Sequence, residues 1–456
     1  MNYEEFLNGK AIEGEYAGFE PPELHAALFP FQAAIVGWAL RKGRAAIFAD
    51  TGLGKTIMQL EWARQVNAHS GRPVLVLAPL AVAEQTVREA RKLGVAAGYA
   101  RHQRDANAPV VVTNYEMLDH FNPSEFSGVV LDESSILKNH TGATRDAIIS
   151  AFERTPFKLA CTATPAPNDH MELGNHAEFL GVMTRVEMLA MYFVHDGGET
   201  SKWRLKGHAG GDFWEWVSTW AAAVKTPADI GHEMSGYDLP GLELEHHIVG
   251  TNFEGGDLFG IARTLQEQRA ARRLSIPDRV NVVAELVAAE PAEPWVIWCD
   301  LNDESAAAAR AVSGAVELTG SDTREEKTAK LEGFSNGSVR VLVTKPSIAG
   351  FGLNWQHCAR TAFLGVGHSF EMFYQSVRRF HRFGQTRPVR VHVVSDVSNS
   401  PALDSLARKQ AQADEMTARM VGRINAHSPL NATPSPKYEY NPTLRMVIPE
   451  FVRSEK

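Results

Sequence analysis

The sequence predicts an α/β chain with two parallel sheets, one in each half, and therefore two lobes. Short apolar, β-branched runs alternate with longer helical patterns, which is typical of βαβ units. A chain of 456 residues also exceeds what one hydrophobic core usually supports. Between the halves the pattern becomes helical and rich in tryptophan, so we expect a helical insertion there.

Nine runs are candidate strands, and in the front half each ends where a distinctive polar sequence begins. The front runs are Ala45 to Ala49, Val74 to Ala78, Val110 to Thr113, Val129 to Asp132 and Leu159 to Thr162. The back runs are Trp295 to Cys299, Val339 to Val343, Thr361 to Leu364 and Val389 to Val394. Ligands of open α/β sheets bind at the carboxyl ends of strands, so these polar sequences are candidate sites.

The alternation of apolar runs and helical patterns divides the chain into four predicted segments. They are an N-terminal lobe at 1–181, a helical insertion at 182–245, a second lobe at 246–399, and a C-terminal helix and tail at 400–456. The insertion contains Trp203, Trp214, Trp216 and Trp220, which are either core anchors or platforms on which bases stack. Ser400 suits the N-cap of the C-terminal helix.

The composition, 44% hydrophobic and 22% charged, is ordinary for a globular protein. Cys161, Cys299 and Cys358 are widely spaced, which favours reduced core thiols over a disulfide framework or a zinc site. No basic segment followed by an apolar stretch opens the sequence, and no run is long enough to span a bilayer. We therefore expect a cytoplasmic protein without a membrane partner.

A net charge of -8 argues against a protein that coats nucleic acid through bulk positive charge. A local basic track is still available, and a solvated helix face explains the same residues equally well. The candidates are Arg263, Arg269, Arg272, Arg273 and Arg279. Other polar residues show no metal-ligand spacing with the cysteines, so surface or loop positions are expected for His208, His246, His247 and His427.

The sequence from Ala49 to Thr56 predicts a phosphate cradle. Its glycines let backbone N–H groups approach phosphate oxygens, Lys55 supplies a charge to the β and γ phosphates, and Thr56 can ligate magnesium. Ala49 replaces the usual first glycine, but a strand precedes the motif and a helix from Ile57 to Val66 follows it. We expect ATP to bind here, with its phosphates cradled by Thr51, Gly52, Leu53 and Gly54.

Two adjacent carboxylates, Asp132 and Glu133, emerge at the end of a buried run. Hydrolysis needs an acid to hold Mg²⁺ and a base to orient the attacking water, and these residues suit those roles in that order. Far along the chain, Gln375 to Gln385 forms an arginine-rich segment of the kind that reaches a nucleotide across a cleft. The two motifs together predict an ATP site shared between two lobes.

Taken in order, these motifs resemble those of the helicase-like ATPases of superfamily two, and more narrowly the Swi/Snf-type DNA translocases. The resemblance covers roughly residues 25 to 400. The family's adenine-contacting segment is similar to Phe29 to Gln32, and Gln32 is the residue expected to contact the base. Further matches are Ala78 to Leu80, Thr113 to Glu116, Thr162 to Pro165, and the glycine-rich Ala349 to Asn354, which includes the candidate nucleotide-binding residue Gly352.

In the arginine-rich segment, Arg379 and Arg382 match the family's two arginine fingers, and both are candidate catalytic residues with Lys55, Asp132 and Glu133. The resemblance implies two RecA-like lobes, ATP and Mg²⁺ as ligands, and movement along DNA. Duplex or branched DNA is expected rather than RNA. A strand-separating or fork-remodelling helicase shares every ATPase motif, and a nucleotide-gated DNA clamp with little turnover is an alternative of another class.

The chain also departs from the family pattern. Ser134 and Ser135 stand where the family usually has alanine and histidine, and Ser347 stands where many members carry a basic residue. We therefore expect a different coupling between hydrolysis and the nucleic-acid track. The compact form resembles phage- or prophage-encoded bacterial members, which implies the cytoplasm of a bacterial or phage-infected cell and an unidentified partner that loads the motor.

Overall fold

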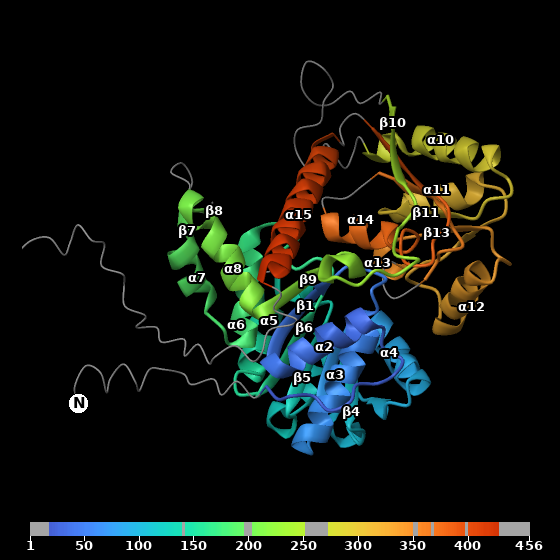
Figure 1. Cartoon of the computed structure of the whole chain (residues 1–456). Helices are drawn as coiled ribbons and strands as arrows, with labels where there is room; N and C mark the ends of the chain where they lie inside the picture. Colours follow the sequence, from blue (N-terminus) through green and yellow to red (C-terminus); the bar gives the residue numbers. More distant parts are fainter. Residues whose placement is uncertain are drawn as a thin grey trace, which may run out of the picture.

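The computed structural model describes residues 18–138, 142–195, 203–250, 272–349, 354–365, 369–396 and 400–427. It contains two parallel sheets, each with helices on both faces, and the lobes built on them meet along one side (Figure 1). The predicted α/β class with two RecA-like lobes is confirmed. Residues 1–17, which open the predicted first lobe, lie outside the described part.

The first sheet has seven strands in the order β3-β4-β2-β5-β6-β1-β9, and every neighbouring pair is parallel. The strands are β1 (Arg44–Ala49), β2 (Val74–Ala78), β3 (Ala97–Tyr99), β4 (Val110–Asn114), β5 (Gly128–Asp132), β6 (Phe157–Cys161) and β9 (Ala221–Val224). Alternate residues enter two different cores: Phe48 lies in one and Ile47 in the other. Burial on both faces explains why these strands are continuously apolar.

Helices cover both faces of this sheet. They are α2 (Pro30–Lys42), α3 (Lys55–Ser70), α4 (Leu80–Lys92), α5 (Ala143–Ala151) and α6 (Leu173–Leu180), with short 3₁₀ helices η1 (Gln103–Asp105), η2 (Tyr115–His120), η3 (Pro123–Glu125), η4 (Ser134–Lys138) and η5 (His170–Glu172). The helix α3 begins at Lys55, directly after Gly54, whose φ of 78° is left-handed and favours glycine. Its N-terminus therefore opens on the predicted cradle.

The segment between the lobes is not helical throughout. It contains α7 (Arg185–Tyr192), β7 (Phe193–His195), β8 (Trp203–Leu205), η6 (Gly207–Ala209), α8 (Gly210–Trp220) and η7 (Pro227–Ile230). The strands β7 and β8 pair antiparallel, and β9 adds to the first sheet beside β1. Trp214 and Trp220 are buried in the first-lobe core, which confirms the core-anchor interpretation for these two.

The second sheet has six parallel strands in the order β10-β15-β14-β11-β13-β12. They are β10 (Leu242–Val249), β11 (Trp295–Cys299), β12 (Ala315–Glu317), β13 (Val341–Thr344), β14 (Arg360–Leu364) and β15 (Val389–Asp396). Its helices are α10 (Ile276–Ala289), α11 (Asn302–Ala311), α12 (Arg324–Ser335), α13 (Pro346–Ala349) and α14 (Phe370–Val377). Cys161, Cys299 and Cys358 are free and buried, as predicted.

The predicted basic track is wrong for two of its members. Arg279 is fully buried and its Nη1 lies 2.9 Å from Glu304 Oε1, and Arg272 pairs with Glu304 at 2.8 Å and with Asp300 at 3.0 Å. These side chains hold the start of α10 against α11, so they cannot follow a nucleic-acid backbone. Arg263 and Arg269 lie outside the described residues.

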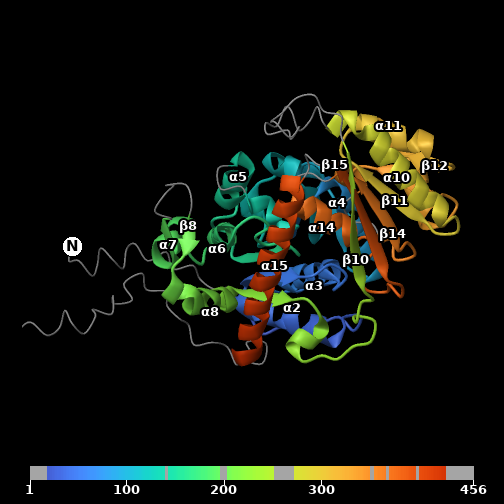
Figure 2. The ribbon, with the colours of Figure 1, turned by 90° about the horizontal axis from the view of Figure 1, so that it is seen from above.

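The last helix, α15 (Ser400–His427), follows the second lobe in sequence but packs against the first. It lies beside α8 and β9 (Figures 1 and 2). Met416 and Met420 enter the first-lobe core. Lys225, just after β9, pairs with Asp414 at 2.8 Å. This helix therefore joins the segment that follows the second lobe to the first lobe. No helix in the described ranges combines the length and hydrophobicity of a membrane span.

Candidate functional site at the junction of the lobes

The loop from β1 to α3 forms the predicted cradle. Gly52 and Gly54 have φ values of 90° and 78°, and Lys55 Nζ donates to the Ala49 carbonyl at 2.9 Å, which holds the ammonium group inside the loop. Backbone N–H groups at the start of a helix and a lysine at its first residue together attract an anion. The local geometry therefore suits a phosphate.

Gln32 is packed against the cradle. It is 3% exposed, its Nε2 donates to the Leu53 carbonyl at 2.9 Å, and its Oε1 accepts from the Phe29 amide at 2.9 Å. A Cβ placed on Gly54 would lie 2.4 Å from Gln32 Nε2, so this contact requires glycine at that position. Gln32 thus positions the loop, and its contact with the adenine base stays a prediction.

Asp132 and Glu133 leave the end of β5 beside the cradle. Asp132 Oδ1 accepts from Gln59 Nε2 at 2.7 Å, and Gln59 stands one helical turn after Lys55 in α3. Glu133 has a φ of 54°, a left-handed conformation that is uncommon outside glycine and recurs at functional sites. Thr162, after β6, donates to Glu133 Oε2 at 3.3 Å.

Burial raises the pKa of both carboxyl groups above its ordinary value, and the charge of Lys55 opposes that rise in each. For Asp132 the hydrogen bond from Gln59 opposes the rise more strongly than Lys55 does. The first lobe therefore gathers an ammonium group and two desolvated carboxyls around one loop. Such a cluster has the composition of a metal-assisted hydrolytic site.

The second lobe brings Arg379 and Arg382 to the same place. Arg379 is 7% exposed, and burial lowers its pKa, with a further lowering from Arg382 and an opposing effect of the Glu133 carboxylate. A Cβ placed on Gly52 would lie 3.0 Å from the Phe383 amide nitrogen and 3.4 Å from Arg382 Cβ. The arginine-rich segment thus lies directly against the cradle, although it is distant in the sequence.

The structure brings most of the predicted site residues together at this junction. Thr51 and Thr56 lie within the same loop and the first turn of α3, and both are partly exposed. Residues 350–353, which include Gly352, lie outside the described part of the chain. The positions are observed, whereas the catalytic, nucleotide-binding and magnesium-binding roles stay predictions.

Sequence reasoning missed a second set of contacts across the junction, centred on Asp50. Its Oδ2 lies 3.0 Å from Arg378 Nη2, and its Oδ1 accepts from the Tyr374 hydroxyl at 2.6 Å. Tyr374 and Arg378 are one helical turn apart at the end of α14. That spacing places both side chains on one face of the helix, and it can be seen in the sequence. Nothing in the sequence around them indicates that Asp50 is their partner.

The two serines that depart from the family pattern are both engaged. Ser134 Oγ lies 3.1 Å from His176 Nε2 within the first lobe, whereas Ser135 donates to Glu371 of the second lobe. Lys138 also pairs with Glu371. The segment that follows the two carboxylates is therefore in direct contact with α14, which is consistent with the expected difference in coupling.

Replacing Arg378 with glutamine should loosen the junction between the lobes. The ion pair with Asp50 is largely buried, with side-chain exposures of 17% and 12%, and a hydrogen bond to a charged group contributes about 1.5–3 kcal/mol. The equilibrium constant for closure of the lobes should fall at least about tenfold. Small-angle scattering without nucleotide measures this as a larger radius of gyration. The control is Arg387→Gln, which breaks a pair with Glu293 inside the second lobe; equal radii in both variants would contradict the expectation.

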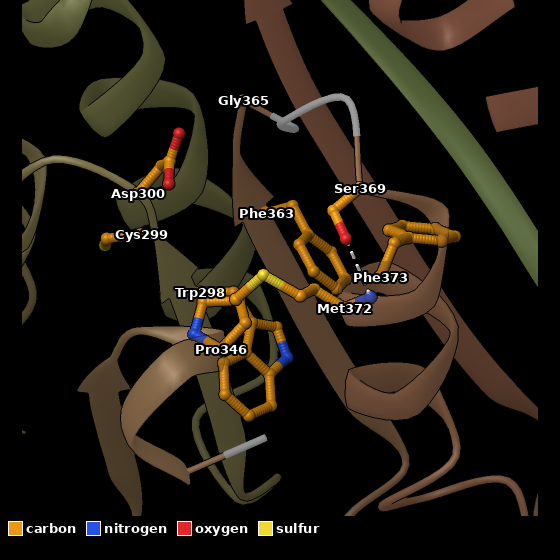
Figure 3. Close-up of a pocket in the computed structure, with 9 residues that line it drawn as sticks. All are labelled: Trp298, Cys299, Asp300, Pro346, Phe363, Gly365, Ser369, Met372 and Phe373. Carbon is orange, nitrogen blue, oxygen red and sulfur yellow. Dashed lines mark hydrogen bonds between the residues drawn. The ribbon is translucent and has the colours of Figure 1, made fainter. Parts of the chain in front are cut away.

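A separate hollow lies at the carboxyl ends of the second-lobe strands (Figure 3). Its lining is mainly aromatic and aliphatic, with Trp298, Phe363, Met372 and Phe373 around it and Asp300 at one side. Every lining residue belongs to the second lobe. An apolar wall with a carboxylate does not suit phosphate, so the hollow is distinct from the cradle in its chemistry.

Comparison with known proteins agrees with this geometry. Residues 29–173 match the DEAD/DEAH box helicase family. The mouse (Mus musculus) "DNA annealing helicase and endonuclease ZRANB3" is 27% identical over 36% of this chain and 17% of its own length. Protein p41 of Acyrthosiphon pisum secondary endosymbiont phage 1 is 27% identical over 41% of this chain and 44% of its own length. This chain thus corresponds to less than half of either relative.

A solved structure, "Sulfolobus solfataricus SWI2/SNF2 ATPase core in complex with dsDNA", aligns with 90% of this chain and 98% of its own, at 18% identity and a TM-score of 0.43. The family match spans the cradle, the two carboxylates and the Thr162 motif. Together with the order of the motifs along the chain, it confirms the recognition made from the sequence. Residues 29–173 are thus similar to a DEAD/DEAH box helicase domain, in agreement with the resemblance to the Swi/Snf-type helicase-like ATPases of superfamily two that the sequence motifs carry.

Proposed function

We propose that this chain hydrolyses ATP between its two lobes and uses the cycle to move along duplex or branched DNA. The observation that carries the proposal is the convergence of the second-lobe Arg379 and Arg382 on the cradle and carboxylates of the first lobe. Phosphoryl transfer needs charged groups of both signs around the phosphates. The carboxylates of the first lobe and the arginines of the second lobe surround the same loop only when the lobes meet.

The residues present fit ATP and magnesium. Amide groups of the cradle, the ammonium of Lys55 and two guanidinium groups form a donor set for the phosphates, and Gln32, which packs against the cradle, matches in sequence the residue with which the family contacts adenine. The hydroxyl of Thr56 and the carboxylate of Asp132 are hard oxygen ligands of the kind Mg²⁺ prefers. When bound, the ion would neutralise phosphate charge and orient the β and γ groups.

The residues of the chain have separate roles in ATP hydrolysis. Gln59 fixes the carboxylate of Asp132 through its 2.7 Å hydrogen bond, and Thr162 orients that of Glu133. Glu133 accepts a proton from the attacking water, while Lys55 holds the phosphates. Arg379 and Arg382 stabilise the negative charge that develops on the transferred group.

Movement follows from the two-lobe arrangement. Closure of the lobes is favoured while the arginines have phosphate charge to stabilise. Hydrolysis removes that charge, so the lobes can separate and contact a new position on the DNA. The support for DNA comes from the family and from the name of the ZRANB3 relative. We place this activity in the cytoplasm of a bacterial or phage-infected cell, in line with the similarity to the phage protein.

The substrate is tested with ATPase assays on blunt duplex, forked and single-stranded DNA and on duplex RNA. We expect more stimulation by duplex or branched DNA than by RNA, and displacement of a triplex-forming strand without unwinding of a blunt duplex. Because binding releases counterions, stimulation should decline with added salt, with a modest slope for a chain of net charge -8.

Three outcomes would contradict this proposal. Efficient separation of a blunt duplex would favour the strand-separating helicase. DNA binding that depends on ATP but shows little turnover would favour the nucleotide-gated clamp. Equal ATPase activity with and without nucleic acid would exclude a motor. The control is Glu133→Gln, which should bind DNA but show no displacement.

A further inference from the structure

Three side chains of types that can ligate a metal meet at the outer edge of the second sheet, far along the chain from the cradle. Glu245 and His247 project from the same face of β10, and His392 comes from the neighbouring strand β15. The sequence suggested surface or loop positions for the histidine pair, with no metal role, because neither has ligand spacing with a cysteine. His247 instead lies in a strand, and its partner is another histidine.

The distances within this cluster match one face of a zinc tetrahedron. His247 Nε2 lies 3.1 Å from His392 Nδ1, and Glu245 Oε2 lies 3.4 Å from His392 Nδ1 and 3.9 Å from His247 Nε2. Tetrahedral bonds of about 2.0–2.1 Å place neighbouring ligand atoms about 3.3 Å apart. A single ion at the centre would therefore reach all three atoms with only small side-chain movements.

The surroundings hold the ring of His392 in place and leave the other two side chains accessible. His392 is 5% exposed, and its ring stacks on that of Trp295 with the centroids 5.6 Å apart. Glu245 and His247 are more open, which leaves room for a water molecule as the fourth ligand.

The nearby arginines form their ion pairs with carboxylates outside the cluster. Arg390 pairs with Glu243 at 2.9 Å and with Glu290 at 3.4 Å, and Arg360 also binds Glu290. Arg360 and Arg390 are thus each paired with a carboxylate outside the cluster, and Arg390 has a further electrostatic attraction to Glu245. The carboxylate of Glu245 remains available to balance part of the charge of a divalent cation.

We propose that Glu245, His247 and His392 bind one zinc-class divalent cation, with water as the fourth ligand. Two imidazoles and a carboxylate suit Zn²⁺ and similar borderline ions better than Mg²⁺. The ion would fasten β10, the strand through which the chain enters the second lobe, to β15. This inference does not depend on the proposed ATPase activity.

The test uses the full chain stripped with a chelator and returned to buffer with excess Mg²⁺, so that magnesium sites are filled. Zinc chloride is titrated by calorimetry, and cobalt chloride is added separately to record visible absorption. We expect about one zinc ion per chain, tetrahedral cobalt bands, and a rise in the unfolding midpoint of about 5 °C at saturating zinc.

Variants at the more open ligands keep the test independent of folding. His247→Ala and Glu245→Gln should each weaken zinc binding more than about a hundredfold and remove the midpoint shift. The matched control is His246→Ala, because His246 is the neighbouring residue on the opposite face of β10. Absence of zinc binding in the unmodified chain, or equal binding in the His246 and His247 variants, would overturn the proposal.

Discussion

Replacing Arg379 with alanine should lower kcat for ATP hydrolysis by roughly 10³-fold, the scale of an arginine finger. Arg379 is buried, and it is close enough to Glu133 for the two charges to influence each other. Removing it leaves developing phosphate charge without a guanidinium partner on that side. Arg382→Ala should have an effect of the same order, because Arg382 Cβ lies against the cradle glycine Gly52.

This prediction is checked with steady-state ATPase assays at saturating DNA, together with DNA affinity measured without nucleotide. Affinity should change little, since the arginines face the cradle rather than an exposed surface. The control is Arg387→Ala, which removes a guanidinium that pairs with Glu293 within the second lobe. Normal hydrolysis with lost DNA binding would instead make this segment a nucleic-acid contact.

Changing Glu133 to glutamine should leave ATP binding intact and slow hydrolysis at least about a hundredfold, the usual scale of losing a positioned base. Glutamine keeps the shape of the side chain and can still meet the Thr162 hydroxyl, but it cannot accept a proton from water. Lys55→Ala should behave differently, because it removes the charge held inside the cradle: both ATP binding and turnover should be lost.

Binding of a fluorescent ATP analogue and single-turnover hydrolysis separate these two variants. Burial raises the pKa of Glu133. As the pH falls, hydrolysis by the unmodified chain should therefore begin to decline at a higher pH than it would if the base were an exposed glutamate. The base works only when deprotonated, so this acid limb should vanish in Glu133→Gln. Glu125→Gln, an exposed glutamate in η3, is the control. Hydrolysis at the unmodified rate by Glu133→Gln would show that another group is the base.

The buried strands and the motifs after them could be predicted from the sequence because both are local patterns. The runs Val74–Ala78 and Trp295–Cys299 agree with β2 and β11 to the residue, since polar or proline-containing segments bound each continuous apolar run. The cradle is likewise contained in one short segment. Its chemistry needs only a strand, a glycine turn and a helix that starts with lysine.

Among the strands that the sequence did not predict, β9 and β10 are two whose conformation depends on their neighbours. Ala221–Val224 consists largely of alanine, the best helix former, and it becomes β9 only by pairing with β1 at the sheet edge. Leu242–Val249 mixes charged and apolar residues and is mostly exposed, yet it pairs with β15 along its whole length. Strand propensity measures the fit to a pleated surface, and that surface comes from elsewhere in the chain.

The sequence by itself determined the fold class, the resemblance to a known family and the residues proposed to bind phosphate, because these depend on short segments with their own geometry. Only the tertiary structure decided which distant groups meet: Asp50 with Tyr374, 324 residues apart, and His247 with His392, 145 residues apart. It also assigned Arg279 to a buried ion pair rather than a nucleic-acid track. Such pairings depend on how the sheets and lobes pack against each other. That packing cannot be inferred from the distance between two residues along the sequence.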